Sequence, residues 1–261
     1  MKSSAVKARP PSAGGASLSR FRPVTAWVFD LDNTLYPAHV DVYPQVEKRI
    51  RDYVERLLHT GPDEAHRIQK EFQDRYGATL TGLVAEYGIT PDDFLEYVHD
   101  IDHSSIEANP LLAERIAALP GKKYILTNGS KRHAEKVGER LGVTGQFDEI
   151  FDIAWAGHLP KPSPAVYERL LGEIKVEPGA VALFEDLARN LIVPNRLAMV
   201  TTLVVPPGTR EVVLKLRDDA NGSNEADFVT DNLAAFLGRV LAKLGSDGVS
   251  TAAPGRRSEQ R

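Results

Sequence analysis

The chain has 261 residues, of which 42% are hydrophobic and 26% charged, which is enough for one larger domain with a smaller insertion. Its formal net charge is −4, which argues against a nucleic-acid-binding protein, since such proteins carry a basic face. There is no cysteine, which excludes disulfides and thiol chemistry, and no apolar run approaches a membrane span, so we expect a cytoplasmic protein without a membrane partner.

Both ends of the chain are expected to be disordered. Residues 1–22 carry five basic side chains and no acid, and residues 245–261 are rich in small and charged residues. Low apolar content leaves little burial to offset the entropy of ordering such segments. We expect the basic N-terminal arm to be a solvated tail rather than a polyanion-binding element. Without these ends the body of the chain carries about −10, which suits a site that gathers carboxylates around a metal.

The first apolar run, residues 25–30, leads into two acids. Asp30 and Asp32 would repel each other at the end of a buried strand, and neither has an adjacent Lys or Arg. The arrangement is explained if a divalent cation binds there and one of the carboxylates acts as a nucleophile. If the strand continued, Asp32 would face the same way as Asp30. We therefore predict that Asp30 is the nucleophile and that Asp32 acts first as an acid and then as a base.

No strand pattern follows for about 75 residues. Residues 37–108 instead place apolar side chains at helical spacing, with helix boundaries signalled at Gly61-Pro62, Gly77 and Pro91. We predict a helical cap that is inserted after the first strand and lies over the carboxyl ends of the strands, where open α/β sheets bind ligands. A lid in this place would exclude water and select the substrate.

From residue 109 onward, apolar runs alternate with helical patterns. One helix is predicted to begin after Ser130 and end at Gly142, and another covers about 164–173. Strands are predicted at 123–127, 150–154, 180–185, 198–205 and, more weakly, 227–229. This alternation is typical of a parallel sheet with helices on both faces. We predict an α/β core made of residues 23–36 and 109–244.

Polar groups follow three of the apolar runs, and these are Asp30, Thr127 and the pair Glu185-Asp186. The carboxyl ends of parallel strands share one edge of a sheet, so we expect these side chains to meet there. A fourth group, Lys161, lies between two prolines that would stiffen its loop.

These residue types suit phosphoryl transfer. Mg²⁺ prefers oxygen ligands, which Asp30, Asp186 and the Asp32 backbone carbonyl would supply, with Glu185 assisting. Charge on the equatorial phosphate oxygens would be stabilised by the Thr127 hydroxyl, Lys161 and nearby backbone N–H groups.

The motifs Asp30-x-Asp32-x-Thr34, Thr127-Asn128-Gly129, Lys161 and Glu185-Asp186 resemble the four motifs of the haloacid dehalogenase superfamily. The resemblance covers about residues 24–242. It implies a Rossmann-like core with a C1-type helical cap, Mg²⁺ as cofactor, and an aspartyl-phosphate formed on Asp30.

A narrower resemblance points to the pyrimidine 5′-nucleotidase branch, on residues 29–37, 76–83, 97–102, 126–130 and 184–191. It implies hydrolysis of nucleoside monophosphates such as UMP and CMP. The substrate contacts predicted on this basis are Asn128, Gly129, Tyr76, Thr79 and His99. Two positions depart from the pattern: Ala78 stands where the branch often has a second Thr, and Asn190 stands where many relatives carry a further Asp.

Several alternatives remain open at this stage. A sugar-phosphate phosphatase or mutase would differ only in the cap, whereas a 2-haloacid dehalogenase would have no use for an acid at Asp32. A catalytically silent scaffold would be expected to have lost at least one of the chemical positions. His99 and His103 have the spacing of a zinc pair, but without further ligands we predict a capped or solvent-facing pair. Core packing competes with base stacking for Tyr76.

Overall fold

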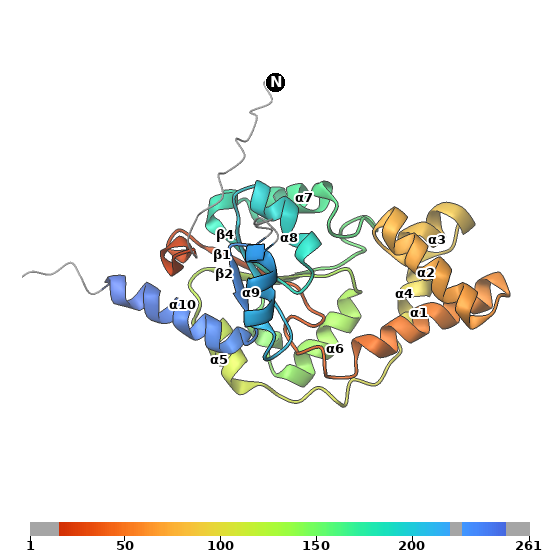
Figure 1. Ribbon diagram of the computed structural model, residues 1–261, viewed down its shortest axis with the longest axis horizontal. Coiled ribbons are helices and arrows are strands. Elements are labelled where there is room, and N and C mark those ends of the chain that lie inside the picture. The colour runs from red at the N-terminus through yellow and green to blue at the C-terminus, as the bar shows by residue number, and fades with distance from the viewer. Residues whose placement is uncertain (1–15, 220–225, 249–261) are drawn as a thin grey trace, which may run out of the picture.

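A computed structural model describes residues 16–219 and 226–248 of the chain (Figure 1). The disorder predicted for residues 1–15 and 249–261 lies outside these described residues. Within them, one parallel sheet has the strand order β3-β2-β1-β4-β5-β6. Its strands are β1 (Ala26–Phe29), β2 (Lys122–Leu126), β3 (Glu149–Phe151), β4 (Val181–Glu185), β5 (Val200–Val204) and β6 (Phe228–Thr230). The predicted Rossmann-like α/β core is confirmed.

The central strands are buried on both faces, which explains their nearly continuous apolar sequences. Alternate residues of β1 join different apolar clusters: Trp27 and Phe29 pack on one face, and Ala26 and Val28 on the other. β1 pairs with β2 and β4 in parallel, so Phe29 lies opposite both Ile125 and Phe184. The residues that follow these three strands therefore emerge side by side.

Helices cover both faces of the sheet (Figure 1). The face of Trp27 is covered by α5 (Pro110–Ala118), α6 (Lys131–Leu141) and α10 (Leu233–Gly248). The opposite face is covered by α7 (Pro164–Ile174), α8 (Ala188–Arg196) and α9 (Arg210–Asp219). As predicted, Ser130 caps α6 by accepting a hydrogen bond from the His133 N–H, and Gly142 ends the helix in a left-handed conformation. None of the helices in the described ranges has the length and apolar character to cross a membrane.

The segment before β1 departs from the predicted disorder. Residues Leu18–Phe21 form a short 3₁₀ helix (η1), and the ring of Phe21 is fully buried. It stacks on Trp27 with ring centroids 5.8 Å apart and meets Phe236 edge-on. A single aromatic ring supplies enough apolar area to order a short segment that is otherwise polar, which a count of apolar residues does not register. At the other end, α10 continues to Gly248, beyond the boundary predicted at residue 244.

Four helices occupy the stretch between β1 and α5 and project from one end of the sheet (Figure 1). They are α1 (Tyr43–Leu58), α2 (Pro62–Tyr76), α3 (Thr79–Tyr87) and α4 (Pro91–Val98). Their inward side chains, among them Val54, Phe72 and Leu83, form an apolar cluster separate from the two clusters of the sheet. Gly77 ends α2 in a left-handed conformation, which an L side chain would resist. These helices form the cap, and the predicted boundaries of 37–108 remain our proposed division.

Two shorter helical turns complete the fold. They are η2 (Thr144–Gln146), before β3, and η3 (Pro178–Ala180), before β4. Both lie at the end of the sheet where the strands begin, away from the cap.

Candidate active site

Three strand ends place the predicted polar groups together. Asp30 follows β1 directly, Thr127 follows β2, and Asp186 follows β4, whose last residue is Glu185. The Asp30 N–H donates to the Phe184 carbonyl at 2.9 Å, so the β1–β4 pairing extends to the aspartate itself. The convergence that the sequence predicted therefore follows from parallel pairing of β1 with its two neighbours.

Lys161 lies at the centre of a buried polar network. Its Nζ donates to Asp30 Oδ1 at 2.6 Å, to Glu185 Oε2 at 2.7 Å and to the Leu126 carbonyl at 2.8 Å. All three donor positions of the ammonium are thus used. Burial opposes the charge on Lys161, but the carboxylates of Asp30 and Glu185 outweigh it and raise the pKa of Lys161. The group stays a cation and joins the nucleophile candidate to the acidic cluster.

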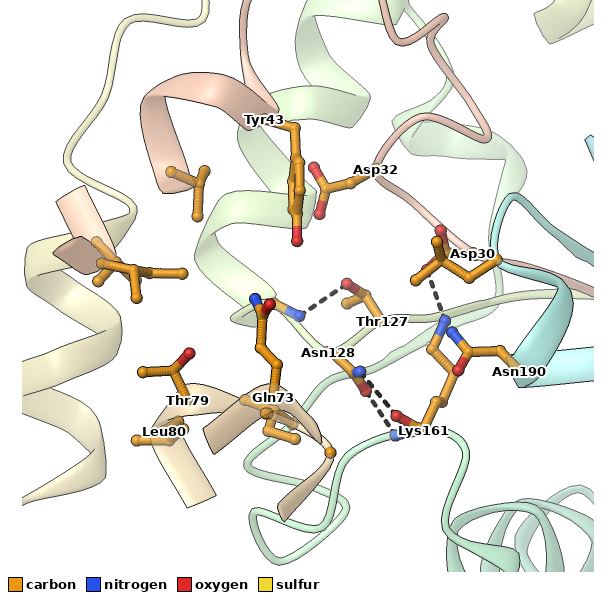
Figure 2. A pocket seen from close by; sticks show the side chains of 18 of the residues that line it. Asp30, Asp32, Tyr43, Gln73, Thr79, Leu80, Thr127, Asn128, Lys161 and Asn190 are labelled. Carbon is orange, nitrogen blue, oxygen red and sulfur yellow. Dashed lines mark hydrogen bonds and ion pairs between the residues drawn. The ribbon is translucent and has the colours of Figure 1, made fainter. Parts of the chain in front are cut away.

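Asn128 holds the Lys161 loop to the end of β2. Its side-chain Oδ1 accepts from the Lys161 N–H at 2.8 Å, and its Nδ2 donates to the Lys161 carbonyl at 3.3 Å (Figure 2). Next to it, the Thr127 hydroxyl oxygen accepts from the Gly129 N–H at 2.9 Å. Asn128 thus clamps the loop that carries Lys161, a role that its motif position alone did not reveal.

Gly129 lies where a side chain would crowd three neighbours. A Cβ built there would meet His133 Cδ2 and Thr127 Oγ1 at 3.3 Å and His99 Nε2 at 3.4 Å. Glycine keeps this part of the pocket open and lets the backbone approach a bound group closely.

The acidic cluster fits a divalent cation. Carboxylate oxygens of Asp30, Glu185 and Asp186 lie within 4.8 Å of one another. Burial, reinforced by the Glu185 charge, raises the pKa of Asp30 to about 7, and burial together with the charge of Asp30 raises that of Asp186 to about 9. A cation would relieve this repulsion, and oxygen-only donors suit Mg²⁺. The Oδ1 of Asn190, which lines the same pocket, is buried without a hydrogen-bond partner in the described part of the chain and would be satisfied by a cation or its water.

Asp32 has a different environment from Asp30. Its Oδ1 accepts from Tyr36 Oη at 2.5 Å and faces His133 Nε2 at 2.8 Å. Burial disfavours its charge, but the His133 imidazole and these hydrogen bonds outweigh burial and lower the pKa of Asp32 to about 2. The two aspartates of one motif are therefore electrostatically distinct, with Asp32 the stronger acid and Asp30 the weaker one.

The histidines form a buried group rather than the capped or solvent-facing pair that was predicted. His99 and His103 are both buried, and each contacts His133, which is fully buried at the start of α6. The prediction was wrong because the third ring comes from a distant segment, so the pair looked partnerless in the sequence. The side-chain Nδ1 of His99 lies 3.0 Å from the Leu95 carbonyl, which can only accept, so Nδ1 carries a hydrogen. Burial lowers the pKa of His99 to about 3, which keeps it neutral.

A pocket of about 180 Å³ joins the strand ends to the cap (Figure 2). Of the predicted substrate contacts, Asn128, Gly129, Thr79 and His99 line it, together with Asp30, Asp32, Thr127, Lys161 and Asp186. Tyr76 is not among the lining residues, because its hydroxyl turns to Glu86 and its ring packs on Phe72.

The cap supplies a largely apolar wall with few polar groups. Its apolar lining residues are Val46, Ile50, Leu80, Phe94, Leu95 and Val98. Sequence reasoning missed Tyr43 and Gln73, which face the strand ends from the cap (Figure 2), and it also missed Arg189. Tyr43 stands at the start of α1, just before the helical pattern that drew attention to that segment, so its position relative to Asp32 carried no sequence signal.

A family model described as "Hydrolase: haloacid dehalogenase-like hydrolase" matches residues 24–193. The chain belongs to the haloacid dehalogenase-like hydrolase family. Among curated proteins, "Phosphate metabolism protein 8" of Saccharomyces cerevisiae is 30% identical over 134 residues, covering 47% of this chain and 41% of that protein. "Enolase-phosphatase E1" of Frankia alni is 36% identical over 66 residues, covering 25% of this chain and 27% of that protein. The chain thus spans less than half the length of these relatives.

Solved structures share the fold at low sequence identity. A haloacid dehalogenase family phosphatase from Thermococcus onnurineus has a TM-score of 0.54 at 19% identity, covering 84% of this chain and 98% of that one. An L-2-haloacid dehalogenase from Xanthobacter autotrophicus has a TM-score of 0.50 at 19% identity, covering 83% and 98%. Phosphate-ester and carbon–halogen chemistry therefore occur on this fold, and the site must decide between them.

Proposed function

We propose that this protein is a phosphomonoesterase that transfers the phosphoryl group of a small phosphate ester first to Asp30 and then to water. The observation that carries the proposal is the pairing of two unlike aspartates in one pocket. Asp30 is bound to Lys161 beside the acidic cluster, whereas Asp32 is bound to Tyr36 and His133. A nucleophile and a separate acid–base group are what phosphate-ester cleavage needs. A curated relative named as a phosphatase supports the same reaction class.

In the first step, an Asp30 carboxylate oxygen forms a bond to phosphorus while the bond from phosphorus to the ester oxygen breaks. The leaving alkoxide takes a proton from Asp32, whose proton affinity rises as an anionic phosphate approaches it. The Thr127 hydroxyl and the Lys161 ammonium stabilise charge on the transferring group.

In the second step, Asp32 acts as a base. It takes a proton from a water molecule, whose oxygen attacks phosphorus, and the bond from phosphorus to the Asp30 oxygen breaks. Inorganic phosphate leaves and Asp30 is restored as a carboxylate. The low pKa of Asp32 ensures that a carboxylate is available for this step once the leaving group has taken its proton.

Asp30, Glu185 and Asp186 would hold Mg²⁺, with the Asp32 backbone carbonyl as a further oxygen donor. When bound, the cation would neutralise the repulsion between the carboxylates and an incoming phosphate. Without that cation Asp30 would be about half protonated at pH 7, since its pKa is raised to about 7.

Nucleoside 5′-monophosphates, with pyrimidines preferred, are the substrates we propose. The motif resemblance to pyrimidine 5′-nucleotidases extends through the cap, at residues 76–83 and 97–102. The cap wall combines apolar side chains with Tyr43, Gln73 and Thr79, which would supply a surface for a flat base and a few hydrogen bonds to its edge.

The test is phosphate release from UMP, CMP, dUMP, dTMP, AMP, GMP, ribose 5-phosphate and glucose 6-phosphate, with Mg²⁺ and with EDTA. We expect turnover that requires Mg²⁺ and is fastest with UMP or CMP. Asp30→Asn is expected to lower turnover by about 10³-fold or more, because the nucleophile is lost. Asp74→Asn, at an exposed position of α2, is the matched control and is expected to match the wild type.

Other outcomes would separate the parts of the proposal. Preference for a sugar phosphate would keep the chemistry and overturn the nucleotide assignment. Chloride release from 2-chloropropionate without phosphate release would overturn the phosphatase assignment in favour of a dehalogenase. If every ester were inert, a silent scaffold would replace the enzyme.

A further inference from the structure

Asp32 is held by one of its two carboxylate oxygens. Oδ1 is shared by the Tyr36 hydroxyl and His133 Nε2, at 2.5 and 2.8 Å. In the described part of the chain, Oδ2 has no hydrogen-bond partner, and Asp32 lines the pocket that also contains Asp30 and Thr127 (Figure 2). The two donors thus fix the side chain while leaving the second oxygen available to a reacting group.

His133 is itself held in place by other imidazoles. Its ring is fully buried and stacks on His99, with centroids 4.6 Å apart and planes 15° apart. Its Nδ1 lies 3.1 Å from His103 Nε2. A carboxylate oxygen only accepts, so His133 Nε2 carries a hydrogen, and Nδ1 makes the second hydrogen bond of the ring, with His103 Nε2. The contacts on both nitrogens therefore define one orientation of the ring.

The two supporting histidines come from the cap and its return segment. His99 is the residue that ends α4, and His103 lies between α4 and α5. The Ser130 hydroxyl, 3.1 Å from His99 Nδ1, adds a link from the start of α6. His99 and His103 contact His133, and His133 contacts Asp32. These cap residues therefore reach Asp32 indirectly, through His133.

We propose that His133 is a positioning residue for Asp32: its Nε2–H, oriented by His103 and His99, directs the free carboxylate oxygen of Asp32 at the leaving group. The inference rests on the proposed phosphatase reaction and adds a residue that does not touch the substrate's reacting atoms. It also makes the acid–base step depend on the seating of the cap, since two of the three rings belong to that side of the molecule.

Leaving-group dependence tests this role. An alkyl phosphate such as UMP needs a proton on its departing oxygen, whereas p-nitrophenol leaves without one. In His133→Leu, kcat/KM for UMP is expected to fall by about 10²-fold, while that for p-nitrophenyl phosphate falls by less than about 3-fold. His133→Gln, whose amide can still donate to Asp32, is expected to recover UMP turnover to within about 10-fold of wild type. The KM for UMP should change little, because His133 does not bind the ester.

Controls separate positioning from folding. His66→Leu and His66→Gln alter an exposed histidine of α2 and are expected to leave both esters unaffected. If His133→Leu lowered kcat/KM for both esters by the same factor, a merely structural role would explain the loss and the inference would be overturned. The inference would also be overturned if His133→Gln hydrolysed UMP no faster than His133→Leu.

A direct readout does not need activity. In protein labelled with ¹⁵N-histidine, His133 Nε2 is expected to be protonated, with a resonance that shifts in Asp32→Ala. An unprotonated Nε2, or a resonance unchanged by Asp32→Ala, would overturn the hydrogen bond on which the inference depends. If the wild type hydrolyses neither ester, the phosphatase proposal fails, and the catalytic role of His133 fails with it. If the wild type is active and only the His133 variants lose UMP turnover, the phosphatase proposal stands. The result then bears on the role of His133 alone.

Discussion

The two walls of the pocket differ in the chemistry of their side chains: the strand side is charged, and the cap side is mostly apolar. On the strand side, Lys161 uses all its donors on Asp30, Glu185 and a backbone carbonyl, so the charged groups are paired and buried. On the cap side, apolar residues dominate the pocket lining, and the fully buried Gln69 of α2 leaves both atoms of its side-chain amide without partners in the described residues. The strand wall thus combines a fully paired Lys161 with carboxylates that a cation would satisfy, whereas the cap wall is mostly apolar.

This difference teaches where chemistry and selectivity reside. Parallel pairing of β1 with β2 and β4 fixes the charged groups, and a shift of any one of them would leave a buried charge unpaired. The cap helices pack mainly on one another through their own apolar cluster, so their pocket-facing residues can change without disturbing that network. Substitutions on the strand wall should therefore cost both stability and rate, whereas substitutions on the cap wall should alter preference.

The largest effect is expected from Lys161→Met. It would leave Asp30 and Glu185 buried without their cation, so the free energy of unfolding should fall by about 3–5 kcal/mol. Turnover should fall by at least about 10²-fold, because a positive charge beside the phosphoryl site is lost. Urea unfolding and phosphate release would measure the two effects.

The exposed Lys215→Met on α9 is the matched control for Lys161→Met. If both variants unfolded at the same urea concentration, the strand-wall network would contribute no more than a surface charge. The contrast between the two walls would then be lost.

Next in size is the effect of pH on the Mg²⁺-free protein. The pKa of Asp30 is raised to about 7 and that of Asp186 to about 9, so between the unfolded pKa and these values the folded state binds more protons. Stability therefore falls as pH rises through that window. Asp32 has a lowered pKa of about 2, and its contribution is already complete above pH 4.

The decrease is clearest between about pH 7 and 9. One group lowers the free energy of unfolding there by at most about 1.4 kcal/mol per pH unit. His99 and His103 have lowered pKa values, so they are mostly neutral in both states there and add little slope. Thermal melting with EDTA should drop across this range, and Mg²⁺ should stabilise the protein most at its upper end, because the carboxylates are then ionised. A melting temperature that rose with pH in EDTA would contradict the buried acidic cluster.

A smaller and different effect is expected from Ala78→Thr on the cap wall. Ala78 lines the pocket and is the residue before α3, where alanine offers no side-chain cap to the helix. Threonine there should stabilise the protein by up to about 1 kcal/mol and change the ratio of kcat/KM for UMP and CMP by several-fold. Kinetics with p-nitrophenyl phosphate should stay unchanged. An equal effect on all substrates would argue against a selective cap.

The smallest effect is expected from Tyr76→Phe. The Tyr76 hydroxyl bonds Glu86 on the cap surface and does not line the pocket. Substrate preference should therefore be unchanged, as measured with the same nucleotide panel. A change in base preference would show that Tyr76 reaches the substrate after all and would restore the sequence-based expectation.

The strand wall could be read from the sequence because each of its parts is local. Every apolar run that predicted a strand is a strand, and the polar residues that follow β1, β2 and β4 meet because parallel strands end at one edge. The cap helices were also predictable, since Gly61, Gly77 and the prolines at the helix starts mark their limits in the chain.

Contacts between distant segments could not be read in the same way. His133 touches Asp32 across 101 positions of sequence, and nothing beside His133 in the chain indicates a carboxylate partner. Tyr43 and Gln73 face the pocket only because of how the cap is seated on the core. Burial of Phe21 likewise depends on a gap between helix and sheet that exists only after folding.

The aromatic cluster around Phe21 has a practical meaning for anyone shortening this chain. Its ring contacts Trp27, Phe184, Phe228 and Phe236, which come from three strands and α10. A version trimmed to start at Val24 would leave a benzyl-sized hole there, at a loss of about 3–5 kcal/mol. The rings thus uncovered would favour association between copies. Trimming for expression should therefore stop before Ala16, where the same rings stay covered.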